Sequence, residues 1–460
     1  MIPPKTNRLK KLWSLAWNNV RLYRRRHFFT GLGLSAGFCA LILLGGYMLR
    51  MEEYLAVHSI FLRQVGHLSV WKKDSLKLYF QNPEKYSFSP EEQQKIKRAL
   101  APILKAEDRV IPVLSGTGMI TNGCQNLPII FAGIDPQDSE WIYSHPQVHQ
   151  QIPELVHFDQ GVGYWEPEGS LMPINLSPIL FSLLKKKNLF SGGTLSAGEV
   201  VNCSHPDSLI KNSADPSVQI FSAAFDGGIG ITDALLVGLK STGFTFSDET
   251  AVMLSRDVAK NLLRTDNVSR MVIMLANPEN SKSFRVAVAG AIEKAGVDNF
   301  EVLHYTDESV SPIYVGAMNF VYVMMGFFVV LVCGVVILSI ANSFQIAFME
   351  RRHEFATLRS VGFRSGVLRT LLMFEYIQMA AISFAVGGCL AFILKGLNNA
   401  LNLRFQIPGF ANDLQFKLEP TFIFTYSVAL AMMIIVVVSV HFFARQQMKL
   451  KVIELMGTEA

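Results

Sequence analysis

The chain has 460 residues, of which 50% are hydrophobic and 17% are charged, and its mean hydropathy is +0.29. The hydrophobic residues gather in four long blocks, so the composition excludes an ordinary soluble protein and predicts a membrane protein with a large polar segment. The formal net charge is +5. Because the basic N-terminus directly adjoins an apolar block, nucleic acid is not expected as a partner.

Residues 1–27 are expected to form a cytoplasmic amphipathic helix along the membrane surface. They contain eight basic residues and no acidic residue, with Trp13 and Trp17 among the apolar positions. A cationic flank before an apolar span is typical of the cytoplasmic side, and tryptophan favours the interface. A signal peptide has a similar charged start, but the apolar block that follows is too long for one and has no clear small-residue cleavage site. We therefore expect a retained anchor.

Residues 28–50 form the first expected transmembrane helix, because about 20 apolar residues are needed to cross a bilayer. Gly33 and Gly37 lie four positions apart in this block. Small residues at this spacing let helices approach closely in lipid. Both glycines are therefore candidates for helix packing, against another helix of the chain or against a partner subunit.

Residues 51–311 are expected to form a large extracytoplasmic α+β domain inserted between transmembrane helices one and two. Strand-like and helix-like patterns alternate, and Ser89 followed by Pro90 and two glutamates predicts a capped helix start. Further strands are expected at 66–71, 110–114, 128–133, 234–239, 252–254, 270–275 and 300–304, with helices at 255–263 and 278–295. The pattern breaks down over residues 137–230, which predicts a variable subdomain whose aromatic residues and lysines either bind a partner or belong to an ordinary core and surface.

The expected extracytoplasmic domain contains two cysteines, Cys124 and Cys203. A disulfide is chemically permitted if the region lies outside the cytoplasm. Their spacing alone does not decide whether they pair.

Three further spans are expected, at residues 312–345, 367–396 and 420–444, with an extracytoplasmic loop at 397–419 and a cytoplasmic tail at 445–460. Arg445 and two lysines follow the last span, which places both termini in the cytoplasm. The second span carries large, adaptable side chains that could line a substrate cavity for acyl chains, and that could equally face lipid or other helices. These candidate residues are Met318, Met324, Met325 and Phe328.

Between the second and third spans, residues 346–366 turn abruptly charged and contain no helix breaker before Gly362. Helical spacing predicts a short amphipathic helix in which Phe355 and Leu358 are apolar side chains set among charges. A basic cytoplasmic loop that merely obeys the positive-inside rule is the alternative. The residues singled out here are Glu350, Arg351, Arg352, Glu354, Phe355, Leu358, Arg359 and Gly362.

The run Glu350-Arg351-x-x-Glu354-x-x-x-Leu358-Arg359-x-x-Gly362 resembles the signature of FtsX/MacB-like permeases, the membrane subunits of ABC systems. In that family the segment is a coupling helix that fits a groove on a separate ATPase, so the resemblance implies ATPase coupling for these residues. Residues 15–30 resemble the family's N-terminal opening, and Glu375 matches a family glutamate that follows the coupling helix. We expect this glutamate to pair with a nearby arginine.

Catalytic motifs are missing from the sequence. No Gly-x-x-x-x-Gly-Lys-Ser/Thr loop is present to cradle nucleotide phosphates, and no histidine–glutamate cluster has zinc-protease spacing. We therefore expect no enzyme activity, no metal and no cofactor on this chain, with ATP and Mg²⁺ bound by a partner ATPase. A membrane-anchored sensor or enzyme is the alternative class, and it would need an active site within residues 51–311, where none is evident.

The resemblance implies a fold of one plus three transmembrane helices with a porter-like extracytoplasmic domain, closest to the lipoprotein-releasing (LolC/LolE-type) permeases. It implies a multi-pass protein of the inner membrane with a periplasmic domain, a cytoplasmic ABC ATPase, and a second permease chain that is either another copy or a paralogue. A lipoprotein substrate and a periplasmic carrier would complete the system. The alternatives within the class are an efflux permease for small molecules or peptides, and a mechanotransmission permease that regulates a cell-wall enzyme.

Overall fold

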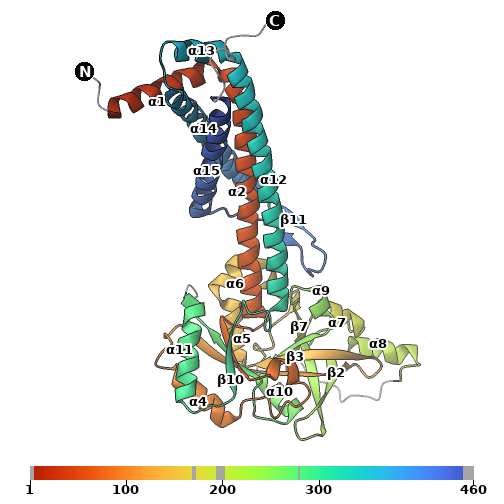
Figure 1. The fold of residues 1–460 in the computed structure, drawn as a ribbon. Helices are drawn as coiled ribbons and strands as arrows, with labels where there is room; N and C mark the ends of the chain where they lie inside the picture. The colour runs from red at the N-terminus through yellow and green to blue at the C-terminus, as the bar shows by residue number, and fades with distance from the viewer. Residues whose placement is uncertain (1–4, 168–171, 193–201, 278–279, 449–460) are drawn as a thin grey trace. The chain divides into compact units, whose positions relative to one another are not determined.

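The structure is a computed structural model of the 460-residue chain, and it describes residues 5–167, 172–192, 202–277 and 280–448. The chain divides into two compact units (Figure 1). The membrane unit comprises Met1–Met51, Asn319–Leu403 and Gln415–Ala460. The sheet unit comprises Glu52–Met318 and Arg404–Leu414.

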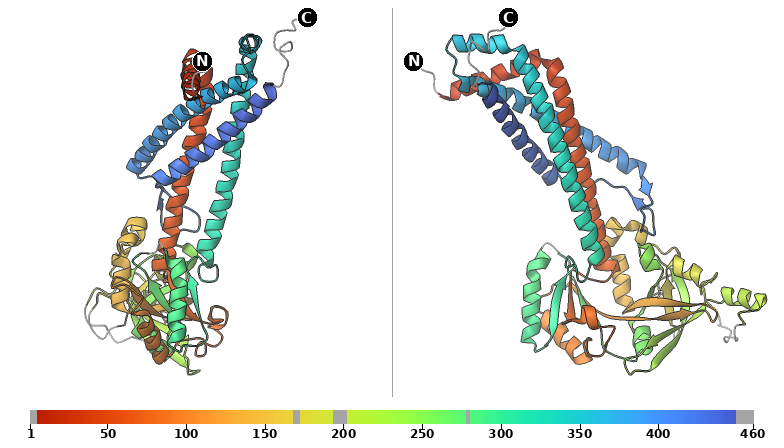
Figure 2. Two further views of the ribbon diagram at one scale, coloured as in Figure 1. Left: turned by 60° about the vertical axis from the view of Figure 1, so that its left-hand side comes forward. Right: turned by 45° about the vertical axis from the view of Figure 1, so that its right-hand side comes forward.

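Long helices build the membrane unit (Figure 2). Among the described residues, four helices are long and apolar enough to cross a membrane. The first three expected spans lie within three of them, and the fourth, 420–444, begins two residues before its helix Phe422–Gln447. The order of these spans across a membrane stays a prediction. The helices that contribute to this unit are α1 (Lys5–Leu22), α2 (Arg24–Val57), α12 (Pro312–Glu350), α13 (Arg352–Ser360), α14 (Ser365–Leu401) and α15 (Phe422–Gln447).

Small residues let α2 pack closely against its neighbours in the membrane unit. A Cβ atom placed on Gly33 would lie 3.3 Å from Ser339 Oγ, and one on Gly37 would lie 3.2 Å from Val332. Both partners are on α12, so the structure uses these two glycines for helix packing within the chain. Helices α2 and α14 approach each other even more closely, because a Cβ on Gly387 of α14 would lie 2.5 Å from the Ser35 carbonyl oxygen of α2.

A mixed sheet forms the sheet unit (Figure 1). Its strand order is β10-β1-β9-β2-β3-β8-β5-β7-β4, with β6 paired to β2 and β7. The pairs β3–β8 and β5–β7 are parallel, and the other pairs along this order are antiparallel. The strands are β1 (Leu68–Lys72), β2 (Arg109–Thr121), β3 (Asn126–Ile134), β4 (Gln160–Gly161), β5 (Pro173–Leu176), β6 (Ser217–Ala223), β7 (Ile229–Leu239), β8 (Ala251–Ser255), β9 (Arg270–Met274) and β10 (Phe300–His304).

Helices cover this sheet over two apolar cores. One core joins β1 and β9 to α4 (Pro90–Leu100) and α11 (Ser281–Lys294), and the other joins the central strands to α7 (Pro178–Leu183) and α10 (Arg256–Leu263). Ser89 caps α4 as predicted, and it forms a capping box with Glu92. The expected α+β alternation is confirmed. Shorter helices are α3 (Ser75–Leu78), α5 (Pro136–Ser144), α6 (Pro146–Gln151), α8 (Pro206–Ala214) and α9 (Thr245–Asp248), with a π-helical turn at His58–Leu62 and a 3-10 turn at Pro153–Leu155.

Residues 137–230 contain more regular structure than the sequence pattern indicated. Helices α5 to α8 and strands β4 to β6 lie wholly or partly in this region. The aromatic residues there pack mainly on one another: Tyr164 is buried, and the Trp165 ring stacks on Tyr143 with centroids 5.2 Å apart. They therefore belong to the interior of this unit.

Cys124 and Cys203 form a disulfide, with Cα atoms 5.6 Å apart. This bond ties the turn after β2 to the segment before α8. A disulfide agrees with a location of the sheet unit outside the cytoplasm.

Residues 397–419, expected as a loop, contain the two-residue strands β11 (Arg404–Phe405) and β12 (Leu414–Gln415).

Candidate functional site

The charged segment between α12 and α14 folds as the short helix α13, and its sequence explains both ends. Arg351 adopts a non-helical backbone conformation between α12 and α13. Gly362 has a φ of +100°, which a residue with a side chain rarely adopts. The Phe363 N–H donates to the Leu358 carbonyl and the Gly362 N–H donates to the Arg359 carbonyl. These two bonds form a Schellman motif, so Gly362 ends the helix as the sequence predicts.

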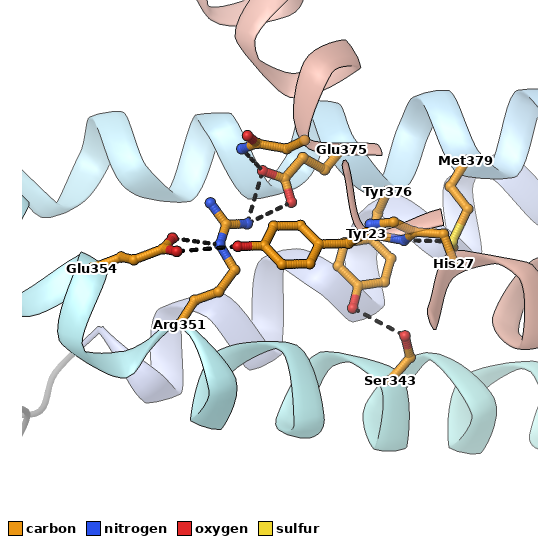
Figure 3. Close-up of polar contacts among 9 residues, drawn as sticks. Tyr23, His27, Ser343, Arg351, Glu354, Glu375, Tyr376 and Met379 are labelled. Atoms are coloured by element: carbon orange, nitrogen blue, oxygen red, sulfur yellow. Dashed lines mark hydrogen bonds and ion pairs between the residues drawn. The ribbon is translucent and has the colours of Figure 1, made fainter. Parts of the chain in front are cut away.

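Arg351 is the centre of a polar cluster at the start of α13 (Figure 3). Its Nη1 donates to both carboxylate oxygens of Glu375 on α14, at 3.1 and 3.0 Å. Its Nε donates to Glu354 Oε2 at 3.0 Å. One guanidinium therefore joins two carboxylates on two different helices, and the predicted pairing of Glu375 with a nearby arginine is confirmed.

The N-terminal helix is tied into the same cluster by Asn19 and Tyr23. Asn19 Nδ2 donates to Glu375 Oε1 at 2.5 Å, and the Tyr23 hydroxyl donates to Glu354 Oε1 at 3.1 Å. The Tyr23 ring also lies 5.3 Å from the Arg351 guanidinium carbon, within the range of a cation–π contact. Residues from α1, the α1–α2 junction, α13 and α14 thus converge on one arginine, and we call these five residues the Arg351 cluster (Asn19, Tyr23, Arg351, Glu354 and Glu375).

Burial makes the charges of the Arg351 cluster interdependent. The side chain of Arg351 is 5% exposed and that of Glu375 is 1% exposed, whereas that of Glu354 is 52% exposed. Burial alone would lower the pKa of Arg351, but the charges and hydrogen bonds of Glu375 and Glu354 outweigh it and raise that pKa. A buried ion pair of this kind costs desolvation, and it is strongly destabilising to remove only one partner.

A second group of contacts lies near the Arg351 cluster (Figure 3). His27 Nδ1 lies 3.4 Å from Met379 Sδ, and the Tyr376 hydroxyl donates to Ser343 Oγ at 3.4 Å. His27 and Tyr376 also meet edge to face, with ring centroids 6.3 Å apart. These contacts link α2, α12 and α14.

The structure distributes the eight residues predicted for ATPase coupling between the interior and the surface. Phe355 is fully buried, its ring stacks on Phe348, and Leu358 packs against the same core. Phe355 therefore lies in the interior of the membrane unit, whereas Leu358 is half-buried. The coupling role of both side chains stays a prediction. Glu350, Glu354 and Gly362 are exposed, Arg352 and Arg359 are half-buried, and Arg351 is buried.

Two apolar residues that the sequence analysis did not select are exposed at the end of α13. Val361 is 74% exposed and Phe363 is 48% exposed. They flank Gly362, the residue that ends the helix, and that position next to the helix-breaking glycine was a signal that could have identified them. The surface that α13 presents consists of these two side chains and the charged residues near them, and we call it the α13 surface (Glu354, Val361 and Phe363).

The four residues proposed for a substrate cavity do not share one environment. Met318 is buried, Met325 is half-buried, and Met324 and Phe328 are exposed on α12. Their role toward a substrate stays a prediction.

Within the described ranges, no group of three or more histidine, cysteine, aspartate or glutamate side chains is arranged to hold a metal ion.

Comparison with known proteins identifies part of the membrane unit. Residues 326–452 match the family described as FtsX-like permease C-terminal, which confirms the predicted resemblance to FtsX-like permeases. The match includes α13 and α14, the helices that carry Arg351's two carboxylate partners. No curated protein sequence matches the chain.

Two solved structures are similar to about half of the chain. The periplasmic region of MacB from Actinobacillus actinomycetemcomitans is 10% identical with a TM-score of 0.32, and the match covers 52% of this chain and 88% of that one. The extracellular domain of the noncanonical ABC-type transporter YknZ from Gram-positive bacteria is 11% identical with a TM-score of 0.30, covering 52% and 99%. With both TM-scores below 0.5, neither similarity carries an argument about function.

Proposed function

We propose, from the match of residues 326–452 to the FtsX-like permease C-terminal family, that this chain is the membrane subunit of an ABC transporter, driven by a separate ATPase. The chain itself binds neither ATP nor Mg²⁺ in this proposal. It lies in the cytoplasmic membrane with both termini in the cytoplasm and the sheet unit in the periplasm. A second permease chain, either another copy or a paralogue, completes the membrane part.

The family match carries the proposal, and the buried ion pair of Arg351 with Glu375 supports a coupling role for α13. An ATPase that pushes on α13 would move a helix whose first turn is held by Arg351 to α14. Because Asn19 and Tyr23 bind the same two carboxylates, α1 and the α1–α2 junction are joined to that movement. The geometry suits a coupling element, since one local displacement reaches three helices of the membrane unit through a rigid, buried contact.

For the transported substrate we propose lipoproteins, extracted from the membrane and passed to a periplasmic carrier. The support is the sequence resemblance to lipoprotein-releasing permeases, together with four apolar helices and a large α+β unit between the first two of them. Efflux of small molecules or peptides, and regulation of a cell-wall enzyme, are the alternatives that the experiment must separate.

The test is to capture tagged full-length protein in mild detergent and to identify every retained protein by mass spectrometry. We expect an ABC ATPase and acylated lipoproteins. An ATPase with a membrane-fusion protein and no lipoproteins would replace lipoprotein release with efflux. An ATPase retained with a cell-wall hydrolase would favour the regulatory alternative. Capture of no ATPase would overturn the proposal as a whole.

A matched pair of variants makes the assay specific for the α13 surface. Val361→Asp places a charge at a residue that is 74% exposed, and we expect ATPase retention to fall at least about tenfold. Val286→Asp makes the same change at a residue of α11 that is 75% exposed, and retention should not change. Equal retention by both variants would exclude the α13 surface as the ATPase contact.

A further inference from the structure

An open cavity of about 510 Å³ lies within the sheet unit and belongs to none of the contacts described above. Five strands that are neighbours in the sheet contribute residues to it, namely β1, β9, β2, β3 and β8. Residues of the short helices α3 and α9 also line it. Its volume lies in the range of cavities that hold small ligands.

Arg270 forms the buried polar part of this cavity. The residue is 8% exposed and begins strand β9, whose other four residues are all buried and apolar. Its Nη1 donates to Ser115 Oγ at 2.7 Å and its Nε donates to the Gln64 carbonyl at 3.4 Å. The guanidinium carbon lies 5.1 Å from the centre of the Trp71 ring. All of these partners are neutral, so the positive charge is held in place without being compensated.

A second arginine, Arg63, lines the same cavity. Within the described ranges, no carboxylate forms an ion pair with Arg63 or Arg270. Arg63 is exposed, whereas Arg270 is buried. Burial lowers the pKa of Arg270 to about 10, and repulsion from Arg63 contributes to that lowering. Two neighbouring cations with no acidic partner favour an anion between them.

One of the residues that line this cavity has a buried hydroxyl without a hydrogen-bond partner in the part of the chain that the structure describes. Ser75 is buried and lines the cavity, and its hydroxyl has no hydrogen-bond partner among the described residues. A buried hydroxyl without a partner is costly, so it is a ready donor to an acceptor oxygen that enters the cavity. Ser75 and the two arginines together could bind the oxygens of a phosphate or a carboxylate.

The other part of the cavity lining is apolar and exposed. Phe80, Ile130 and Phe246 line the cavity, and each of these residues is more than half exposed to solvent. Exposed large apolar side chains in the lining of one cavity indicate a surface that binds apolar material. A simple anion would leave them in water, whereas a ligand that is both acidic and apolar would cover them.

We propose that this cavity binds an amphiphilic anion, with its acidic group between Arg63 and Arg270 and its hydrocarbon part over Phe80, Ile130 and Phe246. An anionic phospholipid has this chemistry. The inference is independent of the proposed transport function, because it needs no ATPase, carrier or lipoprotein. It assigns the sheet unit a lipid-binding site of its own.

Trp71 provides an internal probe for the test, since it lines the cavity. We would titrate the full-length protein, in neutral detergent, with phosphatidylglycerol carrying brominated acyl chains, which quench tryptophan fluorescence on contact. The signal of Trp71 is the difference between the native protein and Trp71→Phe. We expect saturable quenching of this signal, and affinity at least about tenfold weaker for brominated phosphatidylcholine, whose headgroup has no net charge.

Three variants keep the test decisive even if a change at buried Arg270 prevents folding. Arg63→Gln should weaken phosphatidylglycerol binding about tenfold, and Ile130→Asp should weaken it similarly by placing a carboxylate at the apolar opening. Arg264→Gln changes an arginine that does not line this cavity and should leave binding unchanged. Equal quenching by the two lipids, or no effect of Arg63→Gln, would overturn the proposal.

Inorganic phosphate separates the amphiphile from a plain anion. We expect millimolar phosphate to leave the quenching by phosphatidylglycerol within about twofold of its original midpoint, because phosphate gains nothing from the apolar residues. Displacement of the lipid by micromolar phosphate would show a simple anion site and would also overturn the proposal.

Discussion

Arg351 and Glu375 hold the short charged helix α13 against the span α14, with 3.0 Å between Arg351 Nη1 and Glu375 Oε2. Both side chains are almost completely buried in the membrane unit. The pair therefore depends on each partner to compensate the other's charge. The proposed coupling also depends on this contact, so the first variants to test are substitutions of this pair.

Glu375→Gln is expected to destabilise the membrane unit by about 3–5 kcal/mol, because it leaves the buried Arg351 with a neutral partner at that position. Thermal unfolding of the purified full-length protein in detergent measures the change. The matched control is the double variant Arg351→Met with Glu375→Leu, which removes both charges and keeps apolar volume. It should be more stable than Glu375→Gln. If the double variant is no more stable than Glu375→Gln, then the shape of the two side chains, and not the pairing of their charges, determines stability at this site.

Gly387 allows α14 to approach α2. Gly387→Ala would place a Cβ 2.5 Å from the Ser35 carbonyl oxygen, so the helices must separate, and we expect a loss of about 1–3 kcal/mol. Gly396→Ala is the control on the same helix, since no atom lies within 4 Å of its added Cβ. That variant should be neutral or slightly stabilising. Equal melting temperatures for the two variants would contradict the packing.

The disulfide of Cys124 and Cys203 closes a loop of 79 positions in the sheet unit. Cys124→Ser is expected to cost about 2–5 kcal/mol of stability, because the unfolded chain regains the freedom that the bond removes. Thermal unfolding with and without a reducing agent measures it, and the variant should no longer respond to the agent. Cys389→Ser, at an exposed free cysteine, is the control and should behave like the native protein. A native protein that is unaffected by reduction would contradict this expectation.

Local patterns in the sequence sufficed for several elements of the structure. Ser89 and Ser255 cap α4 and α10 as their sequence context predicts, and Gly362 ends α13. These features depend on residues within one helical turn of each other. The pairing of Glu375 with an arginine was also foreseen, because a carboxylate in a span needs a partner and arginines lie close to it in the chain.

The elements missed between residues 137 and 230 have a common cause. The helices α5, α6 and α8, which the sequence pattern did not predict, each begin with a proline, a residue that also interrupts regular structure. At the first helical position proline has no N–H to lose and its fixed φ suits the helix. The same residue type therefore indicates a helix start here, and only the surrounding fold distinguishes the two cases.

Contacts between distant parts of the chain were beyond prediction. Asn19 and Glu375 are 356 positions apart, and nothing near Asn19 indicates that its amide binds a carboxylate. Phe355 has the spacing of an exposed contact on an amphipathic helix, but Phe348 and the bundle core bury it. The side of a short helix that faces inward is decided by the helices that pack on it.

His67 makes the stability of the sheet unit dependent on pH. The side chain is 1% exposed, and its Nδ1 accepts a hydrogen bond from the Leu275 N–H at 3.0 Å. Burial lowers the pKa of His67 from 6.5 to about 4, with smaller contributions from His304 and His145 that lower it and from Asp108 that raises it. Between these pH values the unfolded chain binds a proton that the folded chain does not.

The stability that neutral His67 contributes is therefore complete above about pH 6.5 and is lost as the pH falls toward about 4, by about 3 kcal/mol in all. Hydrogen exchange of the β9 amides in the full-length protein, followed between pH 7.5 and pH 4 and corrected for intrinsic exchange, measures this. His67→Asn keeps an acceptor but does not titrate, so it should make the profile shallower. A slope should remain, because burial also lowers the pKa of His58 and of His304 to about 4. His149→Asn, at an exposed histidine, should leave the profile as it is. A profile that His67→Asn leaves equally steep would exclude His67 as its source.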